Sequence, residues 1–572
     1  FADAGVKLLH IGVNDFSTVP AFPSISAHYH SYCNPAAWQD EYQDSFSELI
    51  VLYCSGYSGP FEAHLESPNM MTVIPGHNEA LVYLMHVDNS GPQNSTQVFA
   101  GYAAAERLFP NAEVSLSTMD AWAHGLLQAR SHLAPLALPI VRGVEIGSTW
   151  IYGVASHPQK MRWYRAVSRV AALAIHAKRV NTADPKFREF QRLMLKVPEH
   201  TWGASSGCTG NFTNVQFHDP SYECFPGKPK YNSYVASLTD QQAFVTRAIE
   251  ALEDLQPIRQ ECEDAIRMGE PQVPDLADLE LFDWTRNTIT ASGITVGFNS
   301  SGAITELQRN GKRFASHDYP LGLFRYATHS EEELDTFGSQ YCLAKCATEC
   351  GRCGFSKCGL SKAGAESAHY QAQIEGAWIN RTSGRIVLKL VFHDADLHAK
   401  YGPPGSATLE FRLSAGKTNQ AINVDVDLQW WNKTATRMAE SLWMTFSPAG
   451  SSRSGWEMDK MGRWVDPLAV VVNGSKTMHA IWSGVRHLDA AVQLESFDAP
   501  VVMPGSSLIP TGAFNLGDDG VPHPERGWSF NLFNNAWSTN YPFFTLNAAE
   551  RFRWKLQLGH IAFGSEPTYT II

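Results

Sequence analysis

A histidine and an aspartate follow a run of apolar residues in the N-terminal part of the chain. His86 and Asp88 come directly after residues 80–85 and lead into Asn89-Ser-Gly-Pro92, a sequence typical of a turn. Because α/β domains place their pockets at the carboxyl ends of strands, both residues are candidate catalytic residues, with Asp88 as an acid, a base or a polar contact. The alternative is structural, since an aspartate in a turn hydrogen-bonds the backbone.

Two more acidic residues stand at similar places. Asp120 follows Leu116-Ser-Thr, at a predicted strand end, where a catalytic role competes with that of a helix N-cap. Glu145 and Trp150 share a Gly-rich stretch, in which an indole could stack on the apolar face of a sugar while the carboxylate holds its hydroxyl groups. We therefore take Asp120 and Glu145 as candidate catalytic residues and Trp150 as a candidate substrate contact.

Further polar and aromatic residues are candidates for the same pocket. His77, Glu199 and His200 could contact a substrate, and a buried, hydrogen-bonded role is the alternative for each. Asn535 and Trp537 could reach the pocket from C-terminal loops, while core packing is the default for a tryptophan. Hydrolysis of a glycosidic bond is one reaction that such residues could perform, because it needs a carboxyl group on each side of the bond.

Three regions with different hydrophobic periods must position these residues. Residues 1–155 alternate strand-like and helical segments, which predicts a parallel, layered sheet from the C-terminal part of an α/β barrel-like domain. Residues 156–275 predict a three-helix bundle, with helices beginning at Pro158, at Pro185 and after Ser237. Residues 276–572 have a period of two and predict a large antiparallel β-sandwich. The expected fold class is α/β plus all-β, in several domains.

Composition limits the partners. The 572 residues carry a formal net charge of -12, which opposes attraction to nucleic acid and to anionic membranes. No stretch approaches the roughly 20 apolar residues that span a bilayer. We expect neither nucleic acid nor a membrane as a partner.

Glycosylation motifs and cysteines indicate a secreted, extracellular glycoprotein with disulfide bonds. The six N-x-Ser/Thr motifs are at Asn94, Asn211, Asn299, Asn380, Asn432 and Asn473. Five of the ten cysteines cluster at Cys342, Cys346, Cys350, Cys353 and Cys358, where zinc and a disulfide-closed loop are alternatives. One pairing hypothesis joins Cys33 to Cys54, Cys208 to Cys224, and Cys262 to one member of the cluster, with two bridges inside the cluster.

Eight motifs in this order resemble a known family. They are Leu9-His-Ile-Gly-Val-Asn14, Pro75-Gly-His-Asn-Glu-Ala80, His86-Val-Asp-Asn-Ser-Gly-Pro92, Ser117-Thr-Met-Asp120, Glu145-Ile-Gly-Ser-Thr-Trp-Ile-Tyr-Gly153, Glu199-His-Thr-Trp-Gly203, Arg437-Met-Ala-Glu440 and Asn534-Asn-Ala-Trp-Ser-Thr-Asn540. With the order of regions, they resemble the glycoside hydrolase family 38 α-mannosidases, and more closely the glycosyl hydrolases of the domain of unknown function 5054. The resemblance implies hydrolysis of an α-linked sugar in a glycan or polysaccharide.

The same resemblance implies missing parts. In these families a zinc-binding His-x-Asp strand and a nucleophilic aspartate precede the segment that resembles Leu9–Asn14, and Ser148 and His157 stand where aspartates are expected. The chain opens on a strand without a signal peptide, so we expect an upstream segment to have been removed, with a second chain from N-terminal processing as a partner. Zinc is expected only if that segment supplies its ligands. The alternative is a non-catalytic carbohydrate-binding glycoprotein.

Overall fold

The structure is a computed structural model of the chain. The residues that it describes are 5–12, 33–42, 45–54, 71–74, 77–82, 91–132, 140–143, 145, 147, 150–200, 202–203, 224–286, 288–341, 357, 359–471, 474, 476–505, 522–537, 541–542 and 544–561. The chain forms two compact units: the first contains Phe1–Gly147, Tyr341–Cys346 and Ala469–Ser475, and the second contains the rest. Each unit is described by itself.

The first unit contains a small mixed sheet. Its order is β1 (Leu8–Gly12), β3 (Ser45–Cys54), β2 (Cys33–Tyr42) and β6 (Ile140–Val141). The pairs β1 with β3 and β2 with β6 are parallel, as the alternation of segments predicts, but β2 and β3 are antiparallel. The prediction of a purely parallel sheet was therefore wrong, because only the two residues 43 and 44 separate β2 from β3, and parallel strands need a crossover of a dozen or more residues.

Two helices and a hairpin complete the described part of the first unit. The hairpin is β4 (Met71–Val73) with β5 (Ala80–Val82), and the helices are α2 (Ser95–Leu108) and α3 (Met119–His132). Asn94 caps α2, since its side chain accepts from the N–H of Gln97. The core joins strand and helix residues: Ile50, Leu52, Ile74, Trp122 and Leu126.

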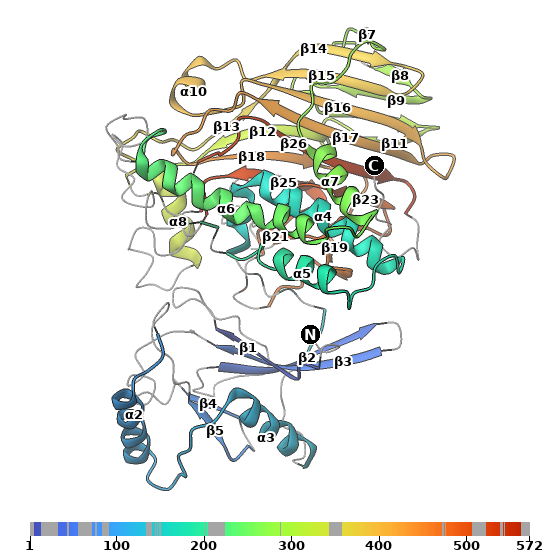
Figure 1. The fold of residues 1–572 in the computed structure, drawn as a ribbon. Helices are drawn as coiled ribbons and strands as arrows, with labels where there is room; N and C mark the ends of the chain where they lie inside the picture. The colour runs from blue at the N-terminus through green and yellow to red at the C-terminus, as the bar shows by residue number, and fades with distance from the viewer. Residues whose placement is uncertain are drawn as a thin grey trace. The chain divides into compact units, whose positions relative to one another are not determined.

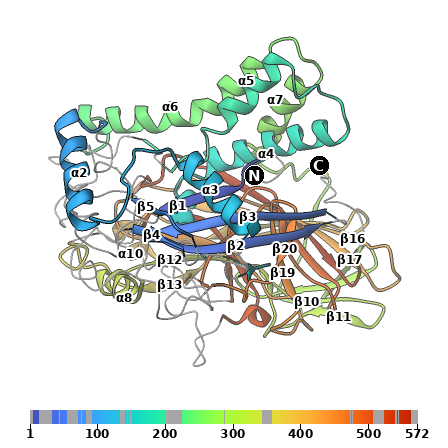
Figure 2. The same cartoon turned by 90° about the horizontal axis from the view of Figure 1, so that it is seen from below.

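The second unit begins with helices. The 3-10 helix η3 (Trp150–Ser156) leads into α4 (Pro158–His176), which α5 (Pro185–Met194), α6 (Pro229–Ala251) and α7 (Ile258–Gly269) follow. Proline occupies the first turn of α4, α5 and α6, where its missing N–H costs nothing. Figures 1 and 2 show that α4, α5, α6 and α7 lie together on one side of the strands of the second unit.

The described helices between residues 156 and 275 differ from the predicted three in two ways. The third helix begins at Pro229, and Ser237 lies within it, where its hydroxyl donates to the carbonyl of Tyr234 rather than capping a terminus. The fourth helix, α7, was not predicted. Val167, Phe187, Val245 and Ile258 come from α4, α5, α6 and α7 and share one core, so the described part of the bundle has four helices.

Two ten-stranded sheets follow. The first, here called the β12 sheet, has the order β21 (His479–Ala480), β24 (Val501–Pro504), β25 (Trp528–Asn534), β18 (Glu440–Phe446), β12 (Leu321–Thr328), β10 (Ile304–Arg309), β9 (Ile294–Phe298) and β8 (Ile289–Ala291), with β11 (Lys312–Ala315) beside β10 and β13 (Ala368–Gln371) beside β12. The second, the β17 sheet, has the order β20 (Arg463–Val465), β19 (Trp456–Lys460), β22 (Gly484–His487), β23 (Val492–Ser496), β26 (Glu550–Leu558), β17 (Ile422–Trp431), β16 (Ser406–Ala415), β15 (Arg385–Val391), β14 (Gln373–Asn380) and β7 (Glu280–Leu281). Among the described residues, short helices interrupt the strands at α8 (Glu331–Tyr341), α10 (Ala395–Lys400) and η5 (Pro524–Arg526).

Aromatic side chains join the two sheets face to face. Phe324 of the β12 sheet stacks on Trp430 of the β17 sheet, with 6.2 Å between ring centroids, and Phe446 meets Trp554 at 5.6 Å. Alternate residues of β26 are buried, which is the period of two that the sequence shows. The antiparallel sandwich, the helical bundle and the mixed α/β character of the fold are therefore confirmed.

Candidate functional site

Three of the predicted substrate-binding residues come together in the second unit. The ring of Trp150 lies 5.4 Å from that of His200 and 5.7 Å from that of Trp537, both in edge-on arrangements. Trp150 is half-buried, His200 is exposed and Trp537 is buried. We call these residues the Trp150 cluster: Trp150, Glu199 and His200, with the buried His157, Lys160, Trp202, Trp537 and Tyr541. The indole of Trp150 is thus partly exposed and packs against the buried ring of Trp537.

The backbone under Trp150 is fixed by the C-terminal part of the chain. The hydroxyl of Tyr541 donates to the carbonyl of Trp150 at 3.1 Å, and the amide of Asn534 donates to the carbonyl of Tyr152 at 2.9 Å. Gly153 is required here, because a Cβ atom at this position would lie 2.2 Å from the ring of Tyr541. These contacts hold η3 in place and so orient the indole.

Charged groups surround the indole. The carboxylate of Glu199 lies 2.6 Å from the imidazole of His200, and about half of each side chain is exposed, 48% and 56%. Beneath them Lys160 is fully buried, and its ammonium lies 4.0 Å above the ring of Trp202. Burial lowers the pKa of Lys160 to about 7, although the negative charge of Glu199 opposes the shift. The cluster thus offers an exposed carboxylate and a buried amine.

Several members of the cluster were not predicted from the sequence. Lys160 and His157 stand on or before α4, and Trp202 and Tyr541 contact each other at 5.1 Å between centroids. Burial lowers the pKa of His157 to about 3, with the charge of Lys160 as the next cause, so this imidazole is neutral. Trp202 lies in the Glu199-His-Thr-Trp-Gly203 motif, which was the available signal. A lysine in the first turn of an amphipathic helix gives no such signal, because most lysines at helix ends lie in solvent.

Two further predicted residues, Asn535 and Trp537, lie in the core of the second unit. Asn535 is fully buried, and its amide donates to two carbonyls while its oxygen accepts from the N–H of Glu440 at 2.8 Å. Trp537 is also buried and packs against Trp150 and Tyr152. Trp537 therefore supports Trp150, whereas Asn535 holds the backbone of residues 436–440, and both have little surface to offer a ligand.

Other candidates belong to the first unit. His77 meets Trp122 edge-on at 5.8 Å, and burial lowers its pKa while Glu79 opposes the shift. The carboxylate of Glu145 accepts from the N–H of Gly147 at 3.2 Å, and its backbone pairs with Val470. His86 and Asp88 lie outside the described residues.

Asp120 is exposed in the first turn of α3. Asp120 is not the N-cap of α3. Thr118 caps this helix, since its hydroxyl accepts from the N–H of Ala121 at 3.1 Å. An acidic side chain in the first turn still favours the helix through its dipole.

The cysteine pairing is corrected at one position. Cys262 is a free, buried thiol in the core of the helical bundle, so it does not bridge to the cluster of five cysteines. Cys33 and Cys54 stand opposite each other in the antiparallel pairing of β2 with β3, and Cys224 is disulfide-bonded. Cys208, Cys342, Cys346, Cys350, Cys353 and Cys358 lie outside the described residues.

Metal binding and membrane-spanning helices are assessed for the described residues alone. There, no three His, Cys, Asp or Glu side chains gather in a way that could hold a metal ion, so the residues present do not fit a zinc site and no step is assigned to zinc. Over the same residues no helix combines the length and the apolar character that crossing a bilayer requires.

In comparisons with known proteins, a family model matches part of the chain. Residues 154–422 match the model of the family described as Domain of unknown function (DUF5054). This match confirms the resemblance to that domain over these residues, whereas the relation to α-mannosidases stays a prediction. No curated protein matches the sequence.

Two solved structures show distant similarity. A galactose mutarotase-like protein from Clostridium acetobutylicum is 9% identical, with a TM-score of 0.24 over 50% of this chain and 98% of that chain. A 4-alpha-glucanotransferase from Thermococcus litoralis is 10% identical, with a TM-score of 0.20 over 98% of this chain and 79% of that chain. At these scores neither likeness supports an argument about activity.

Proposed function

We propose that the protein binds a carbohydrate at the Trp150 cluster. The observation that carries the proposal is the half-buried indole of Trp150, held between His200 at 5.4 Å and Trp537 at 5.7 Å beside the exposed carboxylate of Glu199. An indole face packs against the C–H groups of a sugar ring, and carboxylate and imidazole groups hydrogen-bond its hydroxyl groups. Because Tyr541 and Trp537 already fix the indole, little conformational entropy is lost on binding.

Substitution of the indole tests this proposal. Trp150→Ala should weaken binding to a glycan array or to soluble oligosaccharides about tenfold or more, since it removes the stacking surface. Trp464→Ala is the matched control, because Trp464 is also half-buried but stacks on Arg486 at 3.9 Å, outside the cluster. Equal affinity of the Trp150→Ala variant and the native chain for every glycan would contradict the proposal.

Glycoside hydrolysis is the second candidate function, as an α-mannosidase-like enzyme acting on an α-linked sugar. It is supported by the eight motifs and by Glu199, a carboxylate that is accessible beside the indole. The catalytic residues predicted from the sequence, Asp88, Asp120, Glu145 and His86, all belong to the first unit and are tested by substitution in the same assay. A panel of nitrophenyl glycosides, with Glu199→Gln as the matched variant, separates enzyme from binder.

The composition of purified material belongs to the same test. Intact mass, N-terminal sequencing and zinc analysis would show whether a second chain and a metal accompany this chain, as the resemblance implies. Activity that appears only with that chain and zinc would support hydrolysis. Sugar binding with no activity, no companion chain and no zinc would leave the non-catalytic role. We also propose that the protein is secreted.

A further inference from the structure

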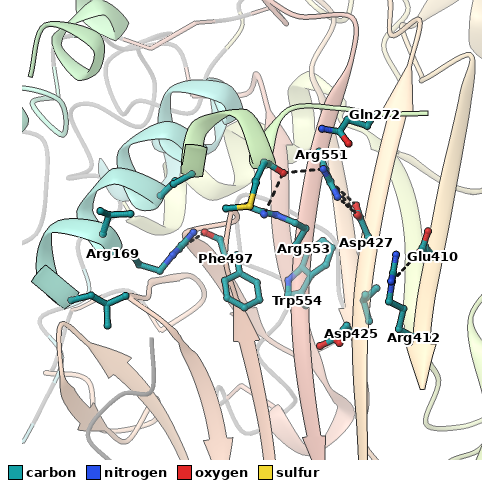
Figure 3. Close-up of a pocket in the computed structure, with 16 residues that line it drawn as sticks. Arg169, Gln272, Glu410, Arg412, Asp425, Asp427, Phe497, Arg551, Arg553 and Trp554 are labelled. Carbon is teal, nitrogen blue, oxygen red and sulfur yellow. Dashed lines mark hydrogen bonds and ion pairs between the residues drawn. The ribbon is translucent and has the colours of Figure 1, made fainter. Parts of the chain in front are cut away.

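A cavity lies between the helical bundle and the β17 sheet, at a place that no predicted site residue lines. Its volume is about 460 Å³, within the range of about 300–1,000 Å³ that small-molecule sites occupy. Arg169 of α4, Met268 of α7 and strand residues of β16, β17 and β26 line it (Figure 3). All of these residues belong to the second unit.

Ion pairs neutralise most of the charge on the wall. Arg551 forms an ion pair with Asp427 at 2.5 Å, and Arg412 donates to Glu410 at 2.7 Å. The guanidinium of Arg553 donates to both carboxylate oxygens of Asp498 at 3.0 Å. Figure 3 shows the paired side chains of Arg551 with Asp427 and of Arg412 with Glu410 facing the cavity.

Asp425 is the exception in this wall. Its Oδ1 atom is buried and accepts no hydrogen bond, although Arg412 and Lys555 occupy the cross-strand positions on either side. Burial raises the pKa of Asp425, and the nearby charges of Lys555 and Arg412 only oppose this shift. A buried acceptor without a donor is costly, so the site is suited to a ligand that supplies one.

The charges of the wall restrict what that ligand can be. Arg412, Arg551 and Arg553 already have carboxylate partners, and the remaining lining arginine, Arg169, offsets the charge of Asp425, so the wall offers little net charge to a free cation or to an anion. A hydroxyl group fits both states of Asp425, because it donates to a carboxylate and accepts from a carboxylic acid. A neutral molecule with several hydroxyl groups satisfies the site.

We propose that this cavity binds a neutral polyol of the size of a mono- or disaccharide, with the side chain of Asp425 as the principal acceptor. The site is separate from the Trp150 cluster and does not depend on binding there. Leu173 and Phe497 supply apolar surface, and the side chains of Gln272 and Arg169 reach the same cavity to hold further hydroxyl groups.

Titration of the full chain with glucose, galactose, mannose and their disaccharides tests the proposal by calorimetry or by saturation-transfer NMR. We expect one of these sugars to bind, and Asp425→Val to weaken it about tenfold or more, as expected for loss of a hydrogen bond to a charged group. The variant should still fold, because it removes the buried Oδ1 atom that has no hydrogen bond, and valine favours a strand. Asn423→Val is the matched control, two residues away on β17 and outside the cavity lining.

The Trp150→Ala variant separates the two sites. Binding that survives in Trp150→Ala and is lost in Asp425→Val supports the cavity. The opposite result overturns the cavity proposal and leaves the Trp150 cluster as the sugar site. Absence of binding by every sugar, or tighter binding of the cation glucosamine than of glucose, also overturns the proposal of a neutral polyol.

Discussion

Ser441 makes two buried hydrogen bonds at the centre of the β12 sheet. Its Oγ atom lies 2.8 Å from Nε2 of His329 and accepts from the indole N–H of Trp443 at 2.7 Å. The other imidazole nitrogen of His329 lies 2.8 Å from the carboxylate of Glu333. The order Ser–His–Glu is that of a hydrolase triad, but Ser441 has 0% of its surface exposed, so a substrate does not reach it. The chain of bonds is structural.

Substitution of this serine should therefore destabilise the protein. Ser441→Ala leaves His329 and Trp443 without their shared partner, and each unsatisfied buried group costs about 1–3 kcal/mol. The measurement is the midpoint of urea unfolding. Ser454→Ala, at an exposed serine, is the control and should stay within about 0.5 kcal/mol of the native chain. Equal midpoints for both variants would show that the buried bonds do not contribute.

Lys160 gives a prediction about pH. Its pKa is about 7 in the folded chain, against 10.5 for an exposed lysine, so the unfolded chain binds more protons between these two values. Stability from this group therefore rises as the pH increases above 7. Lys160→Met removes the titration and should gain stability relative to the native chain at pH 6–7, a gain that shrinks by up to about 1.4 kcal/mol per pH unit above pH 7.

Thermal unfolding of both chains from pH 6 to 9 measures this difference. Lys417→Met, at an exposed lysine, is the control for the same substitution at the surface, and its stability should stay within about 0.5 kcal/mol of the native chain. A difference between Lys160→Met and the native chain that is flat across this range would contradict a titrating Lys160.

Sequence patterns predicted the exposed partners of the Trp150 cluster but not its interior. Trp150 and His200 were identified because aromatic and ionisable residues in turns are typical of binding surfaces. Lys160 was missed, because its ammonium lies over the ring of Trp202, which is remote in the chain. Asn535 was taken for a ligand contact, since an asparagine in a loop motif does not reveal that backbone groups already use its amide.

Arg165 attaches α4 to the sandwich. Its guanidinium donates to three carbonyl groups: those of Phe497 at 3.0 Å, Ile481 at 3.0 Å and Ser496 at 2.6 Å. The side chain is buried, with 2% exposed. One residue of the helix therefore satisfies backbone groups at the ends of two neighbouring segments of the sandwich.

Loss of this anchor should weaken the packing of the bundle. Arg165→Met keeps the length of the side chain but removes the guanidinium donor from all three carbonyls, of which that of Phe497 keeps a second donor, Arg169 at 2.6 Å. The loss should cost about 3 kcal/mol or more, since bonds to a charged donor contribute about 1.5–3 kcal/mol each. Arg188→Met on the exposed face of α5 is the control and should be close to neutral. Hydrogen exchange of α4 should also rise in Arg165→Met; unchanged exchange and stability would rule out the anchoring role.

At the level of elements, the sequence predicted the period of two in the sandwich and the starts of the first two helices of the bundle, at Pro158 and Pro185. β16 and β17 alternate regularly, and the Asn310-Gly311 turn between β10 and β11 has the positive φ values, 47° and 80°, that this pair of residues favours. The start of α6 was misplaced because Ser237 looks like an N-cap, whereas Pro229 was the true signal. A cap motif within a helix has no local feature that distinguishes it from a terminus.

The division of the whole molecule could not be predicted from contiguous segments. The first unit includes residues 341–346 and 469–475, which the sequence analysis assigned to the sandwich region 276–572. Glu145 shows how the later segment joins this unit: its N–H donates to the carbonyl of Ala469 at 2.8 Å, and its carbonyl accepts from Val471 at 2.9 Å. A pairing between segments more than 300 residues apart leaves no trace in local periodicity.

The motifs for N-glycosylation differ in their surroundings. Asn94 and Asn432 are exposed, whereas Asn299 and Asn380 are partly buried and their side chains hydrogen-bond nearby backbone groups. Asn211 and Asn473 lie outside the described residues. At Asn94 the side-chain oxygen caps α2, and glycosylation uses the nitrogen, so both roles are compatible.

Secretion from a eukaryotic host should therefore yield a protein with glycans at Asn94 and Asn432. Thr96→Val and Thr434→Val remove the hydroxyl that each motif requires and keep the asparagine, so each should lower the mass by one glycan while α2 retains its cap. Mass spectrometry before and after treatment with peptide N-glycosidase measures the change. Ser454→Ala, outside any motif, should keep every glycan. If the native chain, passed through the secretory pathway, shows no mass shift on enzyme treatment, the proposal of an extracellular glycoprotein fails.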